Sequence, residues 1–448
     1  MKYGVSRAYY NELKMRSIHI MDQLFSTREK TKRTVFVTRS FIVRCVLALS
    51  LYCRAPIEGI ISFFDLVINY HVSKGIVREI HKQAIEKARE FESHISLECI
   101  ENIAMDEIFQ KNIPILTAVD LATGYIPMME PAKDRSSDTW KSKLDQKKEL
   151  GLEPCLNISD AGSGLLKGIP KAYPDINMQP DIFHSLRDLG IEIRKVERNA
   201  LSELKKLYEY EDRLKGKRVH QSTVTKYNTL NNNIPSILSK ADTANILYEW
   251  LREYTGFTGY GYAKCMELCN WILDELAALY PQNDQFQKTV QAFRKRLPSI
   301  LSFLIRLQER MSQLAQRFHV SADDFELLYH QNAYPPESRI YEQLELRLYK
   351  KLRNRLPEAR EALSELIRTT YRASSLVENV NGRLRNFINL KRIVPDDFFS
   401  LIKPFLNSKK ASRSRRKDWK GTSALDRLTG QSWPEFLDLI CGPIDYVA

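Results

Sequence analysis

The chain has 448 residues, with 68 Lys and Arg against 55 Asp and Glu, which gives a formal net charge of +13 at pH 7. Hydrophobic residues make up 43% of the chain, and it contains only 17 Gly and 18 Pro, so a disordered protein is excluded and an ordered, helix-rich one is indicated. A chain this long exceeds one ordinary core and predicts several domains. The positive charge favours a polyanionic partner, because neutralising phosphates releases condensed counterions.

The cysteines and the apolar stretches argue against secretion and membrane insertion. The seven cysteines are scattered and form no C-x-x-C pair at zinc spacing, which indicates reduced thiols in a cytoplasmic protein. The N-terminus does not have the pattern of a signal peptide. The most apolar stretch, residues 41–64, contains Arg44, Arg54 and Glu58, so it predicts core-packed helices and not a membrane span.

The N-terminal region has the pattern of a DNA-binding domain. Residues 1–38 are basic and polar and predict an arm or short helices. Residues 39–97 then predict two helices, a brief turn and a basic third helix that follows Ser73, a good N-cap. This order is typical of a helix-turn-helix domain, and a helical bundle with solvated charges is the alternative. The expected DNA contacts repeat every four positions on the third helix: Lys74, Arg78 and Lys82.

Residues 98–183 change from helical periodicity to short apolar runs. Three runs in close succession predict an antiparallel meander, and two later ones alternate with helices. The expected strands are residues 103–109, 113–119, 123–129, 153–159 and 177–183. The order βββ-α-β-α-β is that of a ribonuclease-H-like fold, so the expected class is α+β and helix-rich overall. Asp106 would then lie on the first strand and Asp160 at the end of the fourth.

The rest of the chain predicts a large helical insertion into this core. Residues 184–373 are almost wholly helical in pattern, and residues 374–402 would form the second part of the core. Glu378 opens a helix there that Ser374 or Ser375 would cap. Residues 403–448 read as a basic, loop-like tail that lies against nucleic acid or simply solubilises the protein. Its candidate DNA contacts are Arg413, Arg415 and Arg416.

Three acids in this arrangement predict a metal site. Asp106, Asp160 and Glu378, if brought together, could hold two divalent cations that cut or join phosphodiesters. Carboxylates suit this role because Mg²⁺ prefers oxygen ligands. The alternative is that each acid is a surface charge at the end of a strand or helix. Four other acids are weaker candidates because of strand alternation or solvent-facing positions: Glu107, Asp120, Glu358 and Glu365.

The residues around these acids resemble a known family. Ala104-Met105-Asp106-Glu107 and Ser159-Asp160-Ala161-Gly162 are similar to the catalytic core of DDE transposases and retroviral-type integrases. The segment from Ser375 to Arg385 is similar to the helix that carries the family's glutamate. The overall plan resembles that of a bacterial insertion-sequence transposase, over residues 39–182 and 374–430.

This resemblance implies a function and a set of ligands. A DNA transposase of this kind binds double-stranded DNA at the element ends and at the target, and performs metal-dependent hydrolysis and strand transfer. Two Mg²⁺ or Mn²⁺ ions would be held, with Asp106 bridging both and Asp160 and Glu378 each holding one. Arg383 and Arg385, on the glutamate helix, become candidate DNA contacts. A homodimer or higher oligomer in the bacterial cytoplasm, associated with the nucleoid, is implied.

The long gap between Asp160 and Glu378 departs from uninterrupted integrases and is similar to the layout of the eukaryotic hAT group. Those proteins carry a C/D-x-x-H motif, which Asp181-Ile182-Phe183-His184 fits. His184 is therefore a candidate catalytic residue, with a satisfied structural histidine as the alternative. For Trp250 we expect core packing rather than contact with a flipped base.

Two other functions remain open from the sequence. One is a catalytically inactive, transposase-derived regulator that binds specific DNA sequences. The other is a structure-specific nuclease or resolvase on the same core, which would not need both an N-terminal reader domain and a basic C-terminal tail.

Overall fold

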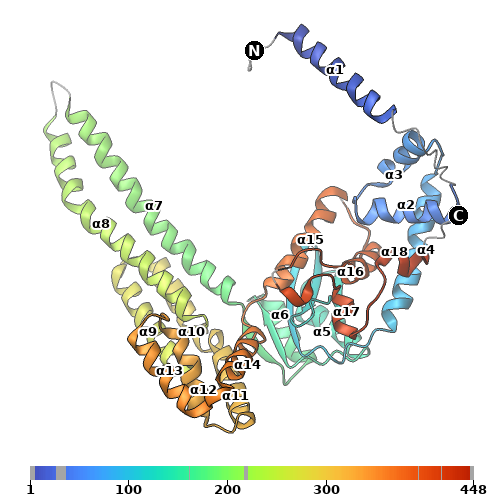
Figure 1. The fold of residues 1–448 in the computed structure, drawn as a ribbon. Coiled ribbons are helices and arrows are strands. Elements are labelled where there is room, and N and C mark those ends of the chain that lie inside the picture. The colour runs from blue at the N-terminus through green and yellow to red at the C-terminus, as the bar shows by residue number, and fades with distance from the viewer. Residues whose placement is uncertain are drawn as a thin grey trace.

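The structure, a computed structural model, describes residues 6–26, 37–160, 162–215, 220–391, 393–414 and 416–443. A mixed sheet lies between a group of helices drawn from both ends of the chain and a long helical region that extends away from it (Figure 1). The protein is therefore helix-rich with one sheet, in the α+β class expected from its sequence.

The sheet has five strands in the order β3-β2-β1-β4-β5. The strands are β1 (Asn102–Gln110), β2 (Ile113–Asp120), β3 (Met128–Pro131), β4 (Leu156–Ser159) and β5 (Asn177–Pro180). β2 is antiparallel to both β1 and β3, while β4 runs parallel to β1 and β5 runs parallel to β4. The meander followed by two parallel strands is the connectivity that the sequence predicted.

The third strand begins later than the sequence predicted. We expected it to start at Thr123, but the carboxylate of Asp120 accepts hydrogen bonds from the backbone N–H groups of Ala122 and Thr123, at 3.2 and 2.9 Å. Gly124 follows with φ +74°, a left-handed conformation that a strand does not contain. This turn delays β3 to Met128.

Helices cover both faces of the sheet. On one face, α5 (Ser137–Lys148) and α6 (Ser163–Ala172) bury the apolar side chains of alternate strand positions such as Met105. On the other face, α15 (Ser375–Lys391) and α16 (Phe399–Ser408) pack on the intervening positions, which include Ala104 and Ile108. Asp106 belongs to this second set by alternation, so α15 faces it.

The N-terminal region contains the helices expected for it. They are α1 (Arg7–Ser26), α2 (Arg39–Leu51), α3 (Ile57–Phe63), the π-helical η1 (Phe64–Ile68) and α4 (Lys74–Ser93). α1 extends away from the rest of the molecule (Figure 1). Ser73 caps α4 by accepting a hydrogen bond from the backbone N–H of Ile76. The apolar residues of α2 to α4 join the hydrophobic cluster on the α15 face of the sheet, so this segment packs on the core. DNA binding by α4 stays a prediction.

His81 on α4 gives this packing a pH dependence. Its Nε2 lies 2.8 Å from Ser50 Oγ, and burial lowers the pKa of His81 to about 4, with the charge of Lys391 lowering it further and that of Asp397 raising it. The folded protein thus favours neutral His81, and the unfolded chain binds a proton below pH 6.5. The stability that this histidine contributes is complete above pH 6.5 and is lost as the pH falls towards 4.

We expect the wild type to lose about 2 kcal/mol more unfolding free energy between pH 7 and pH 5 than the His81→Gln variant. Urea unfolding at the two pH values measures this difference. Equal losses in the two proteins would show that His81 is not desolvated in the fold.

The region after β5 is helical throughout the part that the structure describes. Its elements are α7 (Ile182–Leu214), α8 (Gln221–Tyr254), α9 (Tyr262–Leu279), α10 (Asp284–Ile300), α11 (Ser302–Arg317), α12 (Ala322–His330), η2 (Gln331–Ala333), α13 (Arg339–Leu352), η3 (Arg353–Arg355) and α14 (Leu356–Arg368). The paired α7 and α8 reach away from the sheet, and α9 to α14 gather beside them (Figure 1). This region has a hydrophobic cluster of its own, and its status as a domain inserted into the core stays a prediction. Among the described residues, no helix is long and apolar enough to span a membrane.

The C-terminal segment is more ordered than the loop-like tail expected from residue 403. The second half of α16, which follows η4 (Asp396–Phe398), lies in this segment. After it come η5 (Lys417–Trp419), α17 (Ala424–Thr429) and α18 (Phe436–Cys441). Phe405 and Phe436 are buried in the cluster on the α15 face, with ring centroids 6.1 Å apart. The density of basic residues concealed this apolar face.

Candidate functional site

Asp106 on β1 and Asp160 at the end of β4 lie at matching positions of two neighbouring parallel strands. Met105 of β1 pairs with Ser159 of β4, so the next residue on each strand is one of the two acids. The backbone N–H of Gly162 donates to Asp160 Oδ1 at 3.0 Å, which holds this carboxylate at the turn into α6. The sheet register therefore brings together two acids that are far apart in the sequence.

Helix α15 brings the third acid to the same edge. α15 packs on β1 and β2, and Glu378 lies in its first turn. One turn later, Asn381 is fully buried, and its Nδ2 donates to Asp106 Oδ2 at 2.6 Å. This hydrogen bond fixes α15 against β1 at Asp106.

The charges of the three acids interact. The pKa of Asp106 is raised to about 6, chiefly by burial and also by the negative charges of Asp160 and Glu378. The backbone N–H of Glu107 and the charge of His184 act in the opposite direction. Asp106 is thus a partly desolvated carboxylate among like charges, the environment that a bound cation would stabilise.

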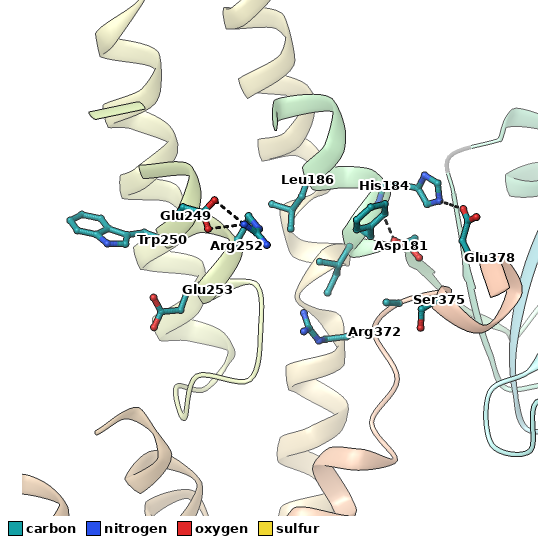
Figure 2. Close-up of a pocket in the computed structure, with 13 residues that line it drawn as sticks. Asp181, His184, Leu186, Glu249, Trp250, Arg252, Glu253, Arg372, Ser375 and Glu378 are labelled. Atoms are coloured by element: carbon teal, nitrogen blue, oxygen red, sulfur yellow. Dashed lines mark hydrogen bonds and ion pairs between the residues drawn. The ribbon is translucent and has the colours of Figure 1, made fainter. Parts of the chain in front are cut away.

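His184 pairs directly with the third acid. Its Nε2 lies 3.0 Å from Glu378 Oε1, and its Nδ1 is buried without a hydrogen-bond partner among the described residues (Figure 2). Glu378 projects from α15 towards the start of α7, where His184 lies. The first turn of the helical insertion therefore contacts the candidate site.

Asp181 joins the two ends of the insertion. It is 2% exposed, and its Oδ1 caps α7 by accepting from the backbone N–H of His184 at 3.0 Å. Its Oδ2 accepts from the backbone N–H of Ser374 at 2.6 Å and from the Ser374 hydroxyl. One buried carboxylate thus holds both His184 and the residue that precedes the Glu378 helix.

A cavity of about 750 Å³ opens beside this pair, between α8 and the start of α15 (Figure 2). His184 and Glu378 line one end, and Trp250 on α8 lines the other. Trp250 is 43% exposed and stacks on Trp271, with ring centroids 6.2 Å apart, so the expected core packing of Trp250 is wrong. Its helical spacing does not reveal this, because α8 is long and only part of its length is covered.

The donor chemistry at this edge fits a hard divalent cation, since all three candidate ligands are carboxylates. In the present arrangement Glu378 is turned to His184, and among the described residues no group of three His, Cys, Asp or Glu side chains converges closely enough to hold a metal ion. Metal binding by all three acids therefore requires Glu378 to rotate from His184 towards Asp106.

The competing acids have other partners. Asp120 caps its own turn, and Glu107 pairs with Arg135 at 2.7 Å on the opposite face of the sheet from Asp106. Glu365 pairs with Arg368 at 2.8 Å on the surface of α14. Glu358 on the same helix is exposed, and its nearest cation, that of Arg317, is 4.0 Å away.

The candidate DNA contacts are spread over two regions. On α4, Arg78 and Lys82 are exposed, whereas Lys74 pairs with Glu58 at 2.8 Å. Near the glutamate, Arg383, Arg385 and Arg413 are exposed, and Arg416 lies over the ring of Trp419 at 4.4 Å. Arg415 lies outside the described residues.

The sequence interpretation did not single out Asn381 or Ser374. Asn381 follows Glu378 by three positions, and this spacing places the two side chains on one helix face, which was a usable signal. Ser374 was considered only as a helix cap, and its contact with Asp181 had no sequence signal because the two residues are 193 positions apart.

Comparison with known proteins places part of the chain with one family of transposases. A family model described as transposase, Mutator family, matches residues 57–253. The match runs from α3 to the end of α8, so it includes Asp106, Asp160 and His184 and stops before Glu378. It supports a DNA transposase, a DNA-processing enzyme. No curated protein matches the chain.

Proposed function

We propose that this chain is a DDE-type DNA transposase, in which Asp106, Asp160 and Glu378 hold two Mg²⁺ or Mn²⁺ ions. The observation that carries the proposal is the position of α15 on β1, where the charge of Glu378 reaches Asp106 together with that of Asp160. The strand order β3-β2-β1-β4-β5 supports a ribonuclease-H-like core around these acids.

Each residue of the proposed site has a separate role in the reaction. Asp106 feels the charges of both other acids and would bridge both cations, with its orientation held by Asn381. When bound, two such ions activate the attacking oxygen and stabilise the leaving oxygen of an in-line displacement. In this proposal Glu378 would turn from His184 to hold a cation. The imidazole of His184 would then face the cavity, where the scissile phosphate would lie.

The partner is double-stranded DNA. The exposed cations of α4 would contact the element ends, and those of α15 and the C-terminal segment would contact the DNA near the acids. Phosphate contacts of this kind position the strand without reading its sequence. A dimer or higher oligomer would hold the two ends together.

The test is cleavage and strand transfer with a pre-cut element end in the presence of Mg²⁺ or Mn²⁺. We expect the wild type to join the end to target DNA, and Asp160→Asn and Glu378→Gln to reduce joining at least about 10³-fold, since a metal ion supplies several kcal/mol of charge stabilisation. Glu365→Gln is the matched control, because this acid is exposed and paired with Arg368.

Two outcomes would contradict the proposal in different ways. If Glu378→Gln retains joining and Glu365→Gln loses it, the third metal ligand is Glu365 on α14 and not Glu378. Specific end binding by the wild type without any cleavage would favour a regulatory DNA-binding protein that lacks catalysis.

A further inference from the structure

A second concave site lies on a neighbouring face of α15. It is a cavity of about 300 Å³, bounded by α15, the end of α16, the segment that follows it, and α17. Ser375 and Glu378 line the cavity beside His184, whereas Leu376, Asn379 and Arg383 line this one. We name it the basic pocket, because six cationic side chains line it: Arg54, Arg383, Lys409, Lys410, Arg413 and Arg427.

The positive charge of the basic pocket is not neutralised within it. None of the described residues that line it is Asp or Glu, and none of its six cations forms an ion pair with a described carboxylate within 4.0 Å. Arg54 Nε is buried and has no hydrogen-bond partner among the described residues. The guanidinium of Arg383 makes no hydrogen bond or ion pair with the described part of the chain, so it is available to a ligand. Like charges gathered in a concave wall concentrate a positive potential and attract an anion.

The far wall of the pocket is a rigid stack. The ring of Trp419 lies between the guanidinium groups of Arg416 and Arg427, at 4.4 and 4.1 Å from the ring centroid. Arg427 is fixed further, since its Nε donates to the carbonyl of Thr123 at 2.8 Å. A Cβ on Gly124 would come within 3.0 Å of the Trp419 ring, so the backbone approaches the stack closely there.

Charges around Arg427 come from several elements. Burial lowers the pKa of Arg427 to about 10, and the neighbouring cations of Arg416 and Arg383 lower it further. The carboxylates of Asp426 and Asp418 raise it without lining the pocket. Arg427 thus remains charged at neutral pH but is repelled by Arg416 and Arg383, and an anion would relieve this repulsion.

We infer that the basic pocket binds a phosphodiester group of the DNA strand that enters the site of Asp106, Asp160 and Glu378; this inference rests on the proposed function. Arg383 follows Glu378 by five residues on one helix, about 7.5 Å along its axis at 1.5 Å per residue. A five-residue step also turns the side chain by about 140° around the axis, at 3.6 residues per turn, so a bound strand would cross α15 between Glu378 and Arg383. Guanidinium groups match phosphate geometry through paired N–H donors. A strand cleaved at Glu378 would therefore place a nearby phosphate in the pocket.

The experiment measures DNA affinity against salt concentration for the full chain and three variants. Arg383→Ala removes a cation that has no partner to lose, Arg383→Lys keeps the charge, and Arg347→Ala is the control, an exposed arginine on α13 in the helical insertion. We expect Arg383→Ala to reduce the steepness of log affinity against log salt concentration by about 0.9. Between 1 M and 0.1 M salt, the DNA affinity of the variant should then rise about eightfold less than that of the wild type. Arg383→Lys should restore the slope, and Arg347→Ala should leave it unchanged.

An Arg383→Ala slope equal to those of the wild type and Arg347→Ala would overturn the inference while leaving the proposed function intact, provided that the wild type binds and cleaves DNA. A wild type that neither binds nor cleaves DNA would overturn the proposed function and this inference with it. Circular dichroism checks folding, and Lys410→Ala, which removes a different cation of the pocket, makes the same test if Arg383→Ala does not fold.

Discussion

The Asp106→Asn variant will lose DNA cleavage and strand transfer by at least about 10³-fold, a loss as large as those expected for Asp160→Asn and Glu378→Gln. The charges of Asp160 and Glu378 both act on Asp106, and in the proposed site it alone would bridge both cations. Losing it removes several kcal/mol of transition-state stabilisation, at about 1.4 kcal/mol per tenfold change in rate. Single-turnover joining of a pre-cut end measures the effect.

This loss must be separated from unfolding. Asparagine can still accept the hydrogen bond from Asn381, and it removes a charge that the neighbouring acids disfavour. The thermal midpoint of Asp106→Asn without metal should therefore equal or exceed that of the wild type. Retained joining, or a loss of joining that follows a lower midpoint, would contradict a direct role for Asp106. Asp120→Asn tests an acid that caps a turn away from the site.

The Asp181→Ala variant will show the largest loss of stability, about 3 kcal/mol or more. The side chain is buried and accepts hydrogen bonds from the backbone of His184 and from both the backbone and the hydroxyl of Ser374. Its removal deletes a helix cap and leaves buried donors unsatisfied, at about 1–3 kcal/mol each. Urea unfolding followed by circular dichroism measures the change.

Asp181 also determines where Glu378 lies, so we expect a loss of activity beyond the loss of folded protein. Under conditions where the variant is folded, joining should still fall, because Ser374 no longer holds the start of α15. Ser374→Ala removes one donor and should cost only about 1 kcal/mol. Asp181→Asn, which keeps an acceptor, should recover part of the stability. Full activity of folded Asp181→Ala would show that the network does not position the site.

The strand that carries Asp106 and the end of β4 at Asp160 could be predicted because Asp106 lies within one short apolar run and Asp160 directly follows another. The choice of Glu378 depended on its helix resembling a known one. The contact between Asn381 and Asp106 was not predicted, because the two residues are 275 positions apart in the sequence. The later start of β3 depends on the turn that Asp120 stabilises.

The C-terminal segment shows why composition alone misled the interpretation. Lys409, Lys410 and Arg413 suggested a solvated loop, but Phe405 and Phe436 pack beneath them on the core. The basic pocket likewise has no sequence signature, since its cations come from segments that only the fold brings together. The exposure of Trp250 was missed because helical spacing does not show which part of the long α8 is covered.

The most direct test of the central claim is the anomalous scattering of Mn²⁺ in a crystal of this protein with a bound DNA end. We expect two ions about 3.5–4 Å apart, both in contact with Asp106, with Glu378 turned from His184 to one of them. Density for Mn²⁺ away from Asp106, or no bound ion while Glu378 remains paired with His184, would contradict this claim.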